Sequence, residues 1–180
     1  MVKIERLKQY QPEIATRVRE LLIQLSRSGK DKGEISPDWF TEIAQSPYHD
    51  LIFAVEDGQI LGMASVSVTF GAGIYKNAYL EDFVVGSRAR GKGVGDLIFQ
   101  AYEDWAREKG CKNLEFTCGH GREVAQNFYK AHGAEIYDTN FFRKKLWTFL
   151  SLVFPVLVWG HSLFLLTMPA IKFLAPTFMR

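Results

Sequence analysis

Six consecutive residues near the middle of the chain have the composition of an anion-binding turn: Arg90, Gly91, Lys92, Gly93, Val94 and Gly95. The β-branched and aromatic residues before them predict a strand over 79–85, and the apolar spacing after them predicts an amphipathic helix ending at Gly110. Glycines let backbone N–H groups approach a phosphate closely, and a helix N-terminus adds partial positive charge. Arg90 and Lys92 add full charges. The alternative is a flexible basic turn without a ligand.

The glycine spacing excludes two widespread phosphate loops. The P-loop pattern G-x-x-x-x-G-K-[ST] is absent, because Asp96 and Leu97 follow Gly95. The dinucleotide-binding pattern G-x-G-x-x-G fails because Asp96 occupies the place of its third glycine. The pattern that remains is R-x-x-G-x-G, formed by Arg90, Gly93 and Gly95.

Between a strand reading L-E-D-x-V-V and a long helix, this pattern resembles motif A of the GNAT superfamily of N-acetyltransferases. The resemblance spans about residues 51–146 and includes C-K-N-L at 111–114 and A-Q-N-F-Y-K-A-H-G at 125–133. It implies an α/β (α+β) fold with a mixed, mostly antiparallel sheet flanked by helices. It also implies acetyl-coenzyme A (acetyl-CoA) as the cosubstrate, with its pyrophosphate in the glycine loop.

The resemblance assigns acetyl-CoA to one continuous part of the chain. Backbone N–H groups of the strand would pair with the pantetheine arm and polarise the thioester carbonyl, and the loop would hold the pyrophosphate. The residues expected to bind the cosubstrate are Phe83, Val84, Val85, Arg90, Gly91, Lys92, Gly93, Val94 and Gly95.

Glu81 is the candidate general base, because similar proteins often use a carboxylate on this strand beside the reacting group. The other interpretation is a solvated or salt-bridged strand residue, since placement matters more than residue type. Alternation along the strand predicts that Asp82 points to the opposite face, so the two carboxylates cannot both serve.

Tyr129 is the candidate general acid. Its segment F-Y-K-A-H-G resembles the family segment F-Y-E-x-x-G-F, whose tyrosine commonly protonates the coenzyme A thiolate. A phenol with a pKa of about 10 and a thiol with one of about 8.5 are workable partners. The alternative is a core aromatic packed with Phe128. Arg122 stands where the family commonly has asparagine, and Ala134 replaces the usual aromatic after the glycine.

Composition limits the other classes of function. The chain of 180 residues is 47% hydrophobic and has a net charge of +2, which predicts one domain with an appendage and no nucleic-acid partner. Its 4 histidines are scattered, so no metal site is expected, and His120 is interpreted as a loop residue. Cys111 and Cys118 are interpreted as free thiols. No base is evident beside Cys118, so direct transfer is preferred to a covalent intermediate.

Periodicity predicts the elements that position the site. Strands are expected over residues 2–7, 51–56, 59–69, 78–85 and 113–118, and helices over 12–26 and from Pro37, with Ser36 as N-cap. The helix after the loop would bury Leu97, Ile98, Ala101 and Trp105, and a later helix would end at Gly133. Short strands over 134–137 and 140–146 would close the domain.

Residues 146–171 carry no charge, a run long enough to cross a bilayer as a helix. Arg143, Lys144 and Lys145 precede it, and Pro155 could divide it into a hairpin. A single span, a re-entrant or in-plane anchor and a helix buried in an oligomer remain open, and the first two need a lipid bilayer. The predicted organisation is a catalytic domain over 1–145 and an anchor over 146–180. The basic residues predict a cell-membrane location with the domain on the cytoplasmic face.

Two functions fit these features. The first is a membrane-tethered N-acetyltransferase that moves an acetyl group from acetyl-CoA directly to a primary amine. The second is a non-catalytic module that binds an acyl-CoA and signals to a membrane partner. The loop supports both, and Glu81 with Tyr129 favours the enzyme. Acceptor selectivity is expected from residues 27–36, 70–75 and 137–140, which do not identify the amine, and a homodimer remains open.

Overall fold

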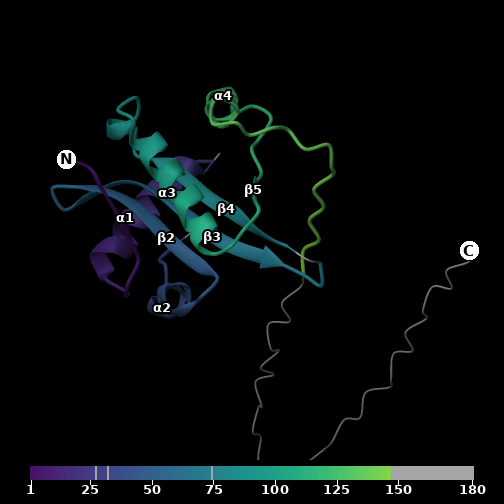
Figure 1. The fold of residues 1–180 in the computed structure, drawn as a ribbon. Helices are drawn as coiled ribbons and strands as arrows, with labels where there is room; N and C mark the ends of the chain where they lie inside the picture. Colours follow the sequence, from purple (N-terminus) through teal and green to yellow (C-terminus); the bar gives the residue numbers. More distant parts are fainter. Residues whose placement is uncertain (27, 32, 74, 147–180) are drawn as a thin grey trace, which may run out of the picture. The chain divides into compact units, whose positions relative to one another are not determined.

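The computed structural model describes residues 1–26, 28–31, 33–73 and 75–146. The chain divides into a compact unit, Met1–Glu135, and a second unit, Ile136–Arg180. All the helices and strands named below belong to the first unit (Figure 1). Apart from Leu146, the uncharged run over 146–171 lies outside the described residues, and the boundary predicted after residue 145 stays a prediction.

A five-stranded mixed sheet forms the centre of the first unit, with its strands in sequence order across the sheet. The strands are β1 (Lys3–Arg6), β2 (His49–Glu56), β3 (Gln59–Phe70), β4 (Lys76–Val85) and β5 (Asn113–Phe116). The first four pair antiparallel with their neighbours, and β5 lies parallel to β4. The mixed, mostly antiparallel sheet predicted from the resemblance is confirmed.

The turn between β2 and β3 follows directly from the sequence. Asp57 and Gly58 have φ angles of 49° and 75°. Two successive positive φ angles give a tight turn whose twist matches that of the flanking strands. The predicted hairpin is therefore confirmed, with each strand one or two residues longer than the hydrophobic pattern indicated.

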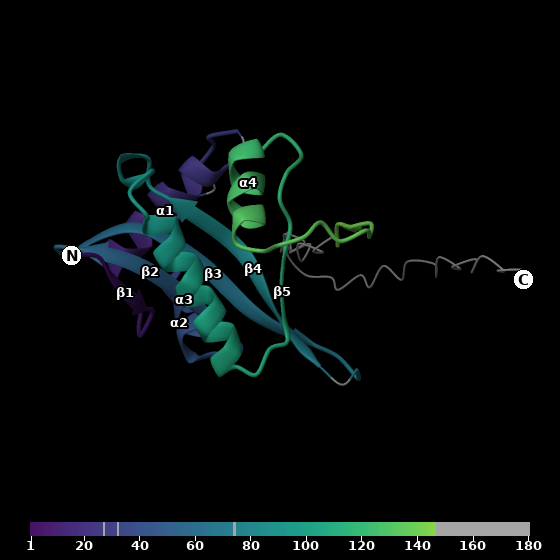
Figure 2. The same ribbon diagram turned by 45° about the horizontal axis from the view of Figure 1, so that its top comes forward.

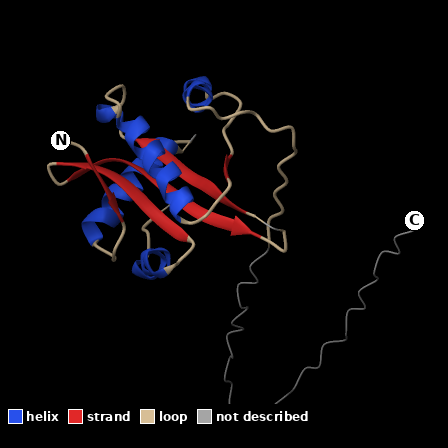
Figure 3. Ribbon diagram, viewed as in Figure 1, coloured by secondary structure: helices blue, strands red, loops and turns tan. Residues whose placement is uncertain are grey.

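Helices flank both faces of the sheet (Figures 1 and 3). On one face, α1 (Pro12–Leu25) and α2 (Pro37–Gln45) share a core with Met63 and Val84. On the other face, α3 (Val94–Glu108) packs on Ala64, Val66 and Leu80. α4 (Glu123–Ala131) lies beside α3 (Figure 2). These two cores use alternate residues of the same strands, as the period of two in a strand requires.

α3 lies close to the sheet because Gly62 has no side chain. A Cβ at that position would lie 2.8 Å from the Val84 carbonyl oxygen and 2.9 Å from Ile98 Cδ1. Further along the helix, the buried Tyr102 hydroxyl donates to the Ala78 carbonyl at 2.8 Å. Leu97, predicted to be buried, is 44% exposed, whereas Val94 and Ile98 on either side of it are buried.

The N-cap predicted at Ser36 is confirmed, whereas one short helical turn was not predicted. The Ser36 hydroxyl accepts a hydrogen bond from the Trp39 N–H at 3.2 Å, as the predicted N-cap should. A 3₁₀ turn, η1 (Ser87–Ala89), follows β4 and was not predicted. A single 3₁₀ turn is too short to produce a periodic hydrophobic pattern.

The two closing strands predicted over 134–137 and 140–146 are wrong. The structure has no helix or strand between Ala134 and Leu146, all of which is described. Alternating apolar residues predicted strands here, yet the side chains of Tyr137 and Phe142 are 86% and 87% exposed. A short strand is stabilised by a partner and a buried face, and the described part of this segment has neither. Within the described residues, no helix is both long and apolar enough to cross a bilayer.

Candidate active site

β4 contains a bulge at Glu81. Asp82 pairs with Ser65 of β3, whereas Leu80 pairs with Val66, so Glu81 is the extra residue. A bulge opposes two residues to one and interrupts the alternation of side chains. Leu80 and Phe83 accordingly both belong to the core beneath α3, although strict alternation would place them on opposite faces. The prediction that alternation sends Glu81 and Asp82 to opposite faces is therefore wrong.

β4 and β5 separate at this bulge. Their pairing runs from Asn77–Asn113 to Leu80–Phe116, and no described strand pairs with the rest of β4 on that edge. The Gly86 N–H donates to the Leu61 carbonyl at 2.8 Å, which fixes the hydrogen-bonding phase between β3 and β4.

Because hydrogen-bonded pairs alternate along antiparallel strands, the N–H groups of Phe83 and Val85 face the open edge. The N–H of Val84 points toward β3. An extended ligand can pair with such an edge as an added strand does. Of the three residues on this strand that were predicted to bind the cosubstrate, Phe83 and Val85 present backbone donors at the open edge, and Val84 does not.

The glycine loop leads from this open edge into α3. Gly93 is the N-cap residue of α3 with φ of 75°, and Gly91 has φ of 71°. Glycine adopts this left-handed conformation without the steric penalty of a Cβ atom. The first helical bond runs from the Leu97 N–H to the Gly93 carbonyl at 3.2 Å. The N–H groups of the preceding residues in the first turn are therefore available to an anion.

The loop is held against the end of β4. The Arg90 side chain donates from Nε to the Val85 carbonyl at 3.0 Å. A Cβ at Gly95 would lie 3.4 Å from the Phe128 ring and 3.8 Å from the Val85 side chain. A groove of about 1540 Å³ is lined mostly by β1, α1 and the β2–β3 turn, and it reaches the loop only at Lys92 and Val94, so it is not the open edge of β4. These features fit acetyl-CoA: an open backbone edge for its amide-rich arm, and a cationic helix N-terminus for its phosphates.

Tyr129 lies in a cluster of rings beneath α3 and α4. Its ring centroid is 4.3 Å from that of Phe116, 6.1 Å from that of Phe83 and 5.7 Å from that of Phe128. Both interpretations of Tyr129 therefore agree with its position: the ring is packed as a core aromatic, and it lies next to Phe83 on the open edge. The helix that carries Tyr129 and the strand that carries Phe83 are far apart in the sequence, and they meet in this cluster.

Burial raises the pKa of the Tyr129 phenol to about 12, with nearby Cys118 acting in the same direction and Arg122 in the opposite one. The phenol is therefore protonated at neutral pH, as a proton donor must be. It is also a weaker acid than an ordinary thiol by about 3.5 pKa units, or about 5 kcal/mol. Full proton transfer to a free thiolate is uphill by that amount, so a hydrogen bond to the departing sulfur is the more favourable contribution.

Glu81 is exposed and hydrogen-bonded. Its carboxylate accepts a hydrogen bond from the Ser67 hydroxyl at 3.2 Å, and Ser67 is only 3% exposed. A general base needs an accessible carboxylate in a defined position; Glu81 is exposed to solvent, and one hydrogen bond holds its carboxylate. Its role as base stays a prediction.

Arg122 connects α4 to α1. Its guanidinium donates to the Leu25 carbonyl at 2.5 Å, at the end of α1. The Gln126 amide donates to the carbonyls of Gly119 and His120 at 3.0 Å, which closes the loop before α4. His120 is exposed in this loop, in agreement with its interpretation as a loop residue. The arginine in place of asparagine therefore has a structural role that its position in the sequence did not reveal.

A second polar group lies on the sheet face opposite α3, and sequence reasoning missed it. Phe116 packs toward α3, so its neighbour Glu115 points to the opposite face. The Asn77 amide donates to the Glu115 carboxylate at 2.6 Å, and Tyr79 is the cross-strand neighbour of Glu115. Glu81 follows Tyr79 by two positions on β4. Alternation along β5 could have predicted from the sequence which face Glu115 occupies. Only the pairing of β5 with β4 shows that Glu115 and Glu81 lie on the same surface.

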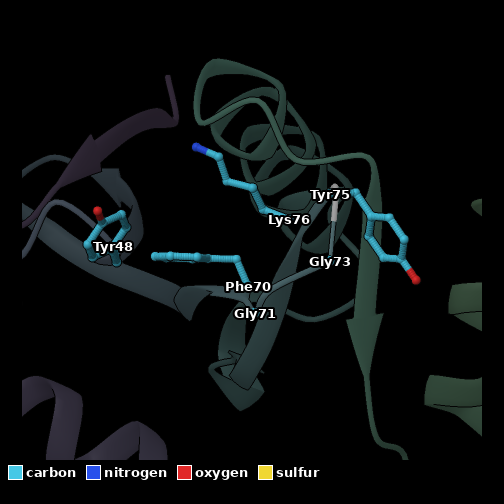
Figure 4. Close-up of a pocket in the computed structure, with 6 residues that line it drawn as sticks. All are labelled: Tyr48, Phe70, Gly71, Gly73, Tyr75 and Lys76. Carbon is cyan, nitrogen blue, oxygen red and sulfur yellow. The ribbon is translucent and has the colours of Figure 1, made fainter.

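A smaller hollow of about 410 Å³ lies at the tip of the β3–β4 hairpin (Figure 4). The rings of Tyr48 and Phe70 are neighbours there, with centroids 5.2 Å apart, and Tyr75 points away from them. Tyr75 precedes Glu81 by six residues, roughly 20 Å along a strand. The predicted selectivity segment 70–75 can therefore reach only a distant part of an acceptor. Arg27, Lys32 and Ile74 of the predicted selectivity segments lie outside the described residues.

Potential metal ligands and the two cysteines form no further candidate site in the described part of the chain. No group of three or more His, Cys, Asp or Glu side chains there could hold a metal ion. Cys111 and Cys118 are free and half-buried, and burial raises the pKa of the Cys111 thiol.

The family model described as "Acetyltransferase (GNAT) family" matches residues 16–134. The matched region contains the bulged strand, the glycine loop and Tyr129. The chain belongs to the acetyltransferase (GNAT) family, and the predicted class, a GNAT-type acyltransferase, is confirmed.

Two relatives indicate the range of amines that similar proteins acetylate. A thialysine N-epsilon-acetyltransferase from Bos taurus is 37% identical over 60 residues, which cover 33% of this chain and 35% of the relative. An aminoglycoside N(6')-acetyltransferase type 1 from Klebsiella aerogenes is 32% identical over 100 residues, 53% of this chain and 66% of the relative. The matched regions thus span less than two thirds of both relatives.

Solved structures confirm the fold. An aminoglycoside acetyltransferase from an uncultured soil metagenomic sample, in complex with sisomicin, has a TM-score of 0.70 at 18% identity and covers 81% of this chain and 97% of its own. The aminoglycoside N-acetyltransferase AAC(6')-Iy in complex with CoA has a TM-score of 0.63 at 22% identity, with 81% and 95% covered.

Proposed function

We propose that this chain is an N-acetyltransferase that transfers an acetyl group from acetyl-CoA directly to a primary amine. The observation that carries the proposal is the open edge of β4, which begins at Glu81 and ends at the glycine loop. Acetyl-CoA would supply a thioester carbonyl and a thiolate leaving group. The N–H groups of Phe83 and Val85 would hold the pantetheine arm and polarise the carbonyl, and residues 90–95 would hold the pyrophosphate.

Two side chains would manage the protons. Glu81 would accept the proton that the attacking amine loses, directly or through water, while the Ser67 hydroxyl orients its carboxylate. The C–N bond forms as the C–S bond breaks, and the Tyr129 hydroxyl would donate a hydrogen bond to the departing sulfur. The high pKa of Tyr129, about 12, keeps this donor protonated throughout the working pH range.

The charges around Glu81 favour a cationic acceptor. Glu81 and Glu115 lie on one sheet face on either side of Tyr79, and they attract ammonium groups. Among the relatives, the acceptors named are thialysine and aminoglycosides. We therefore propose small amines with more than one ammonium group as substrates.

The uncharged run over 146–171 is proposed to anchor the enzyme in a lipid bilayer, with the catalytic unit on the cytoplasmic face. The support is its length and the three basic residues before it. The full chain should stay with membranes through high salt and carbonate, and detergent should release it. Recovery as a discrete soluble oligomer would instead make this run an assembly segment.

A screen of amine acceptors with detection of released thiol tests the proposed activity. We expect thiol release with polyamines or aminoglycosides, and a large loss of turnover in Glu81→Gln. Coenzyme A binding is measured in parallel by calorimetry on the same preparations. Tight binding without turnover on any amine would favour the non-catalytic acyl-CoA module.

A further inference from the structure

Both ring nitrogens of His132 face hydrogen-bond acceptors. Nδ1 lies 2.8 Å from the Phe128 carbonyl oxygen, and Nε2 lies 3.1 Å from Asp96 Oδ1. A carbonyl and an ionised carboxylate can only accept hydrogen bonds, so each nitrogen must carry a proton. His132 is therefore an imidazolium in this arrangement. Its ring also stacks on Phe128 and contacts Phe99, with centroids 4.2 Å and 5.1 Å apart.

The ion pair joins the two helix ends nearest to the glycine loop. His132 is the C-cap residue of α4, and Asp96 lies in the first turn of α3. A cation at a helix C-terminus and an anion at an N-terminus each interact favourably with the helix dipole. The His132 side chain is 26% exposed and that of Asp96 is 61% exposed, so water and salt screen the pair in part.

The Asp96 carboxylate also reaches the loop itself. Its Oδ2 atom lies 3.9 Å from the position that a Cβ of Gly93 would occupy. A negative charge at this point competes with a phosphate for the first N–H groups of α3 and repels it. The same carboxylate thus has one oxygen at the loop and the other at His132.

We propose that His132 is a positioning residue: its imidazolium neutralises Asp96 and so leaves the N-terminus of α3 attractive to the phosphates of coenzyme A. The inference rests on the proposed function, since it needs coenzyme A at this loop. Asp96 is the charged side chain of α3 that contacts His132, and the other groups packed against it on α3 and α4 are the rings of Phe99 and Phe128 and the Phe128 carbonyl.

A purely structural role is the competing explanation. In that case the pair would fasten α4 to α3, and loss of either partner would loosen the site. The two explanations differ for the double variant. If Asp96 is harmful when His132 is absent, removing both charges restores binding; if the pair is only a fastener, the double variant stays as weak as the single one.

The test is calorimetry with coenzyme A on the full chain in detergent, for wild type, His132→Gln, Asp96→Asn and the double variant. We expect binding by His132→Gln to be about tenfold weaker at low salt, the scale for one unit charge several ångströms from another near a protein surface. High salt should shrink this loss. Asp96→Asn and the double variant should bind at least as tightly as wild type. An unchanged His132→Gln, or a double variant as weak as the single one, would overturn the proposal. Absence of binding by all four proteins would instead overturn the proposed function, and the inference with it.

Discussion

The two halves of β4 provide different kinds of binding surface. After the bulge at Glu81, the strand presents backbone N–H groups at an open edge and continues into a glycine loop. Before the bulge, the strand is paired on both sides, and only its side chains are available. There Asn77 and Tyr79 lie beside Glu115 of the next strand.

This difference fits the two ligands proposed for the site. A donor that is the same in every turnover can be held by main-chain groups, whose positions depend on φ and ψ and on few side chains. An acceptor must be distinguished from other amines, which requires charge and shape from side chains. Substitutions in the two halves should therefore change different measurements.

The largest expected effect is that of Gly93→Val on the donor half. A β-branched side chain at φ of 75° is strained, and it would cover the N–H groups of the first turn of α3. We expect coenzyme A affinity to fall by about a hundredfold or more, the loss of roughly two to three hydrogen bonds to a charged group. Calorimetry on the folded variant measures it.

Gly110→Val is the matched control. Gly110 follows the other end of α3 with φ of 71°, and nothing lies within 4 Å of the position of its Cβ. It should suffer the same backbone strain and a similar drop in melting temperature while retaining coenzyme A affinity. If Gly93→Val binds as well as this control, the donor half is not where we place it.

The donor half was largely predictable from the sequence, because its geometry is local. The glycines that permit positive φ at Gly91 and Gly93, and the strand and helix on either side of them, are consecutive in the chain. The acceptor half was not. The bulge at Glu81 is a property of the register between β3 and β4, and Glu115 reaches the surface through pairing of strands 36 residues apart at Asn77 and Asn113.

The same limit explains two other results. The closing strands over 134–146 failed because alternation alone does not supply a partner edge. The contact between His132 and Asp96 joins two helix ends, and no spacing within either helix predicts it. Patterns in the chain thus predicted elements, and only their packing determined which charges meet.

Tyr129→Phe should have the next largest effect, on chemistry alone. The ring packing is preserved and the hydroxyl is lost, so turnover should fall by about a hundredfold, the lower range for a proton donor, with unchanged coenzyme A affinity. Burial raises the pKa of Tyr129 to about 12, so the neutral form predominates below that pH and deprotonation begins only as pH approaches it. Any loss of activity between pH 8 and about pH 10 should therefore be the same in both proteins.

Tyr102→Phe serves as its control, since this buried hydroxyl donates to the Ala78 carbonyl and lies outside the proposed site. It should lower the melting temperature and leave turnover unchanged. Equal turnover in Tyr129→Phe and wild type, measured where chemistry limits the rate, would assign Tyr129 to packing only.

Glu115→Gln should act on the acceptor half with a smaller effect. Loss of one carboxylate should raise the KM for a polycationic amine by several-fold at low salt and leave coenzyme A affinity unchanged. Glu103→Gln removes the same charge from α3, where Glu103 pairs with Arg107, and should change neither value. A rise in KM that is equal in the two variants would mean that only net charge matters.

Ser67→Ala should have the smallest effect, and it tests whether the bulge positions the base. The buried hydroxyl donates to the Glu81 carboxylate at 3.2 Å, and alanine removes this bond without adding volume. Loss of one hydrogen bond to an exposed carboxylate should lower kcat/KM by about two- to tenfold, corresponding to about 0.4–1.4 kcal/mol. In a Glu81→Gln background the same substitution should change nothing further, because its effect passes through the carboxylate. Additive losses in the double variant would mean that Ser67 supports the strand and does not act through the Glu81 carboxylate.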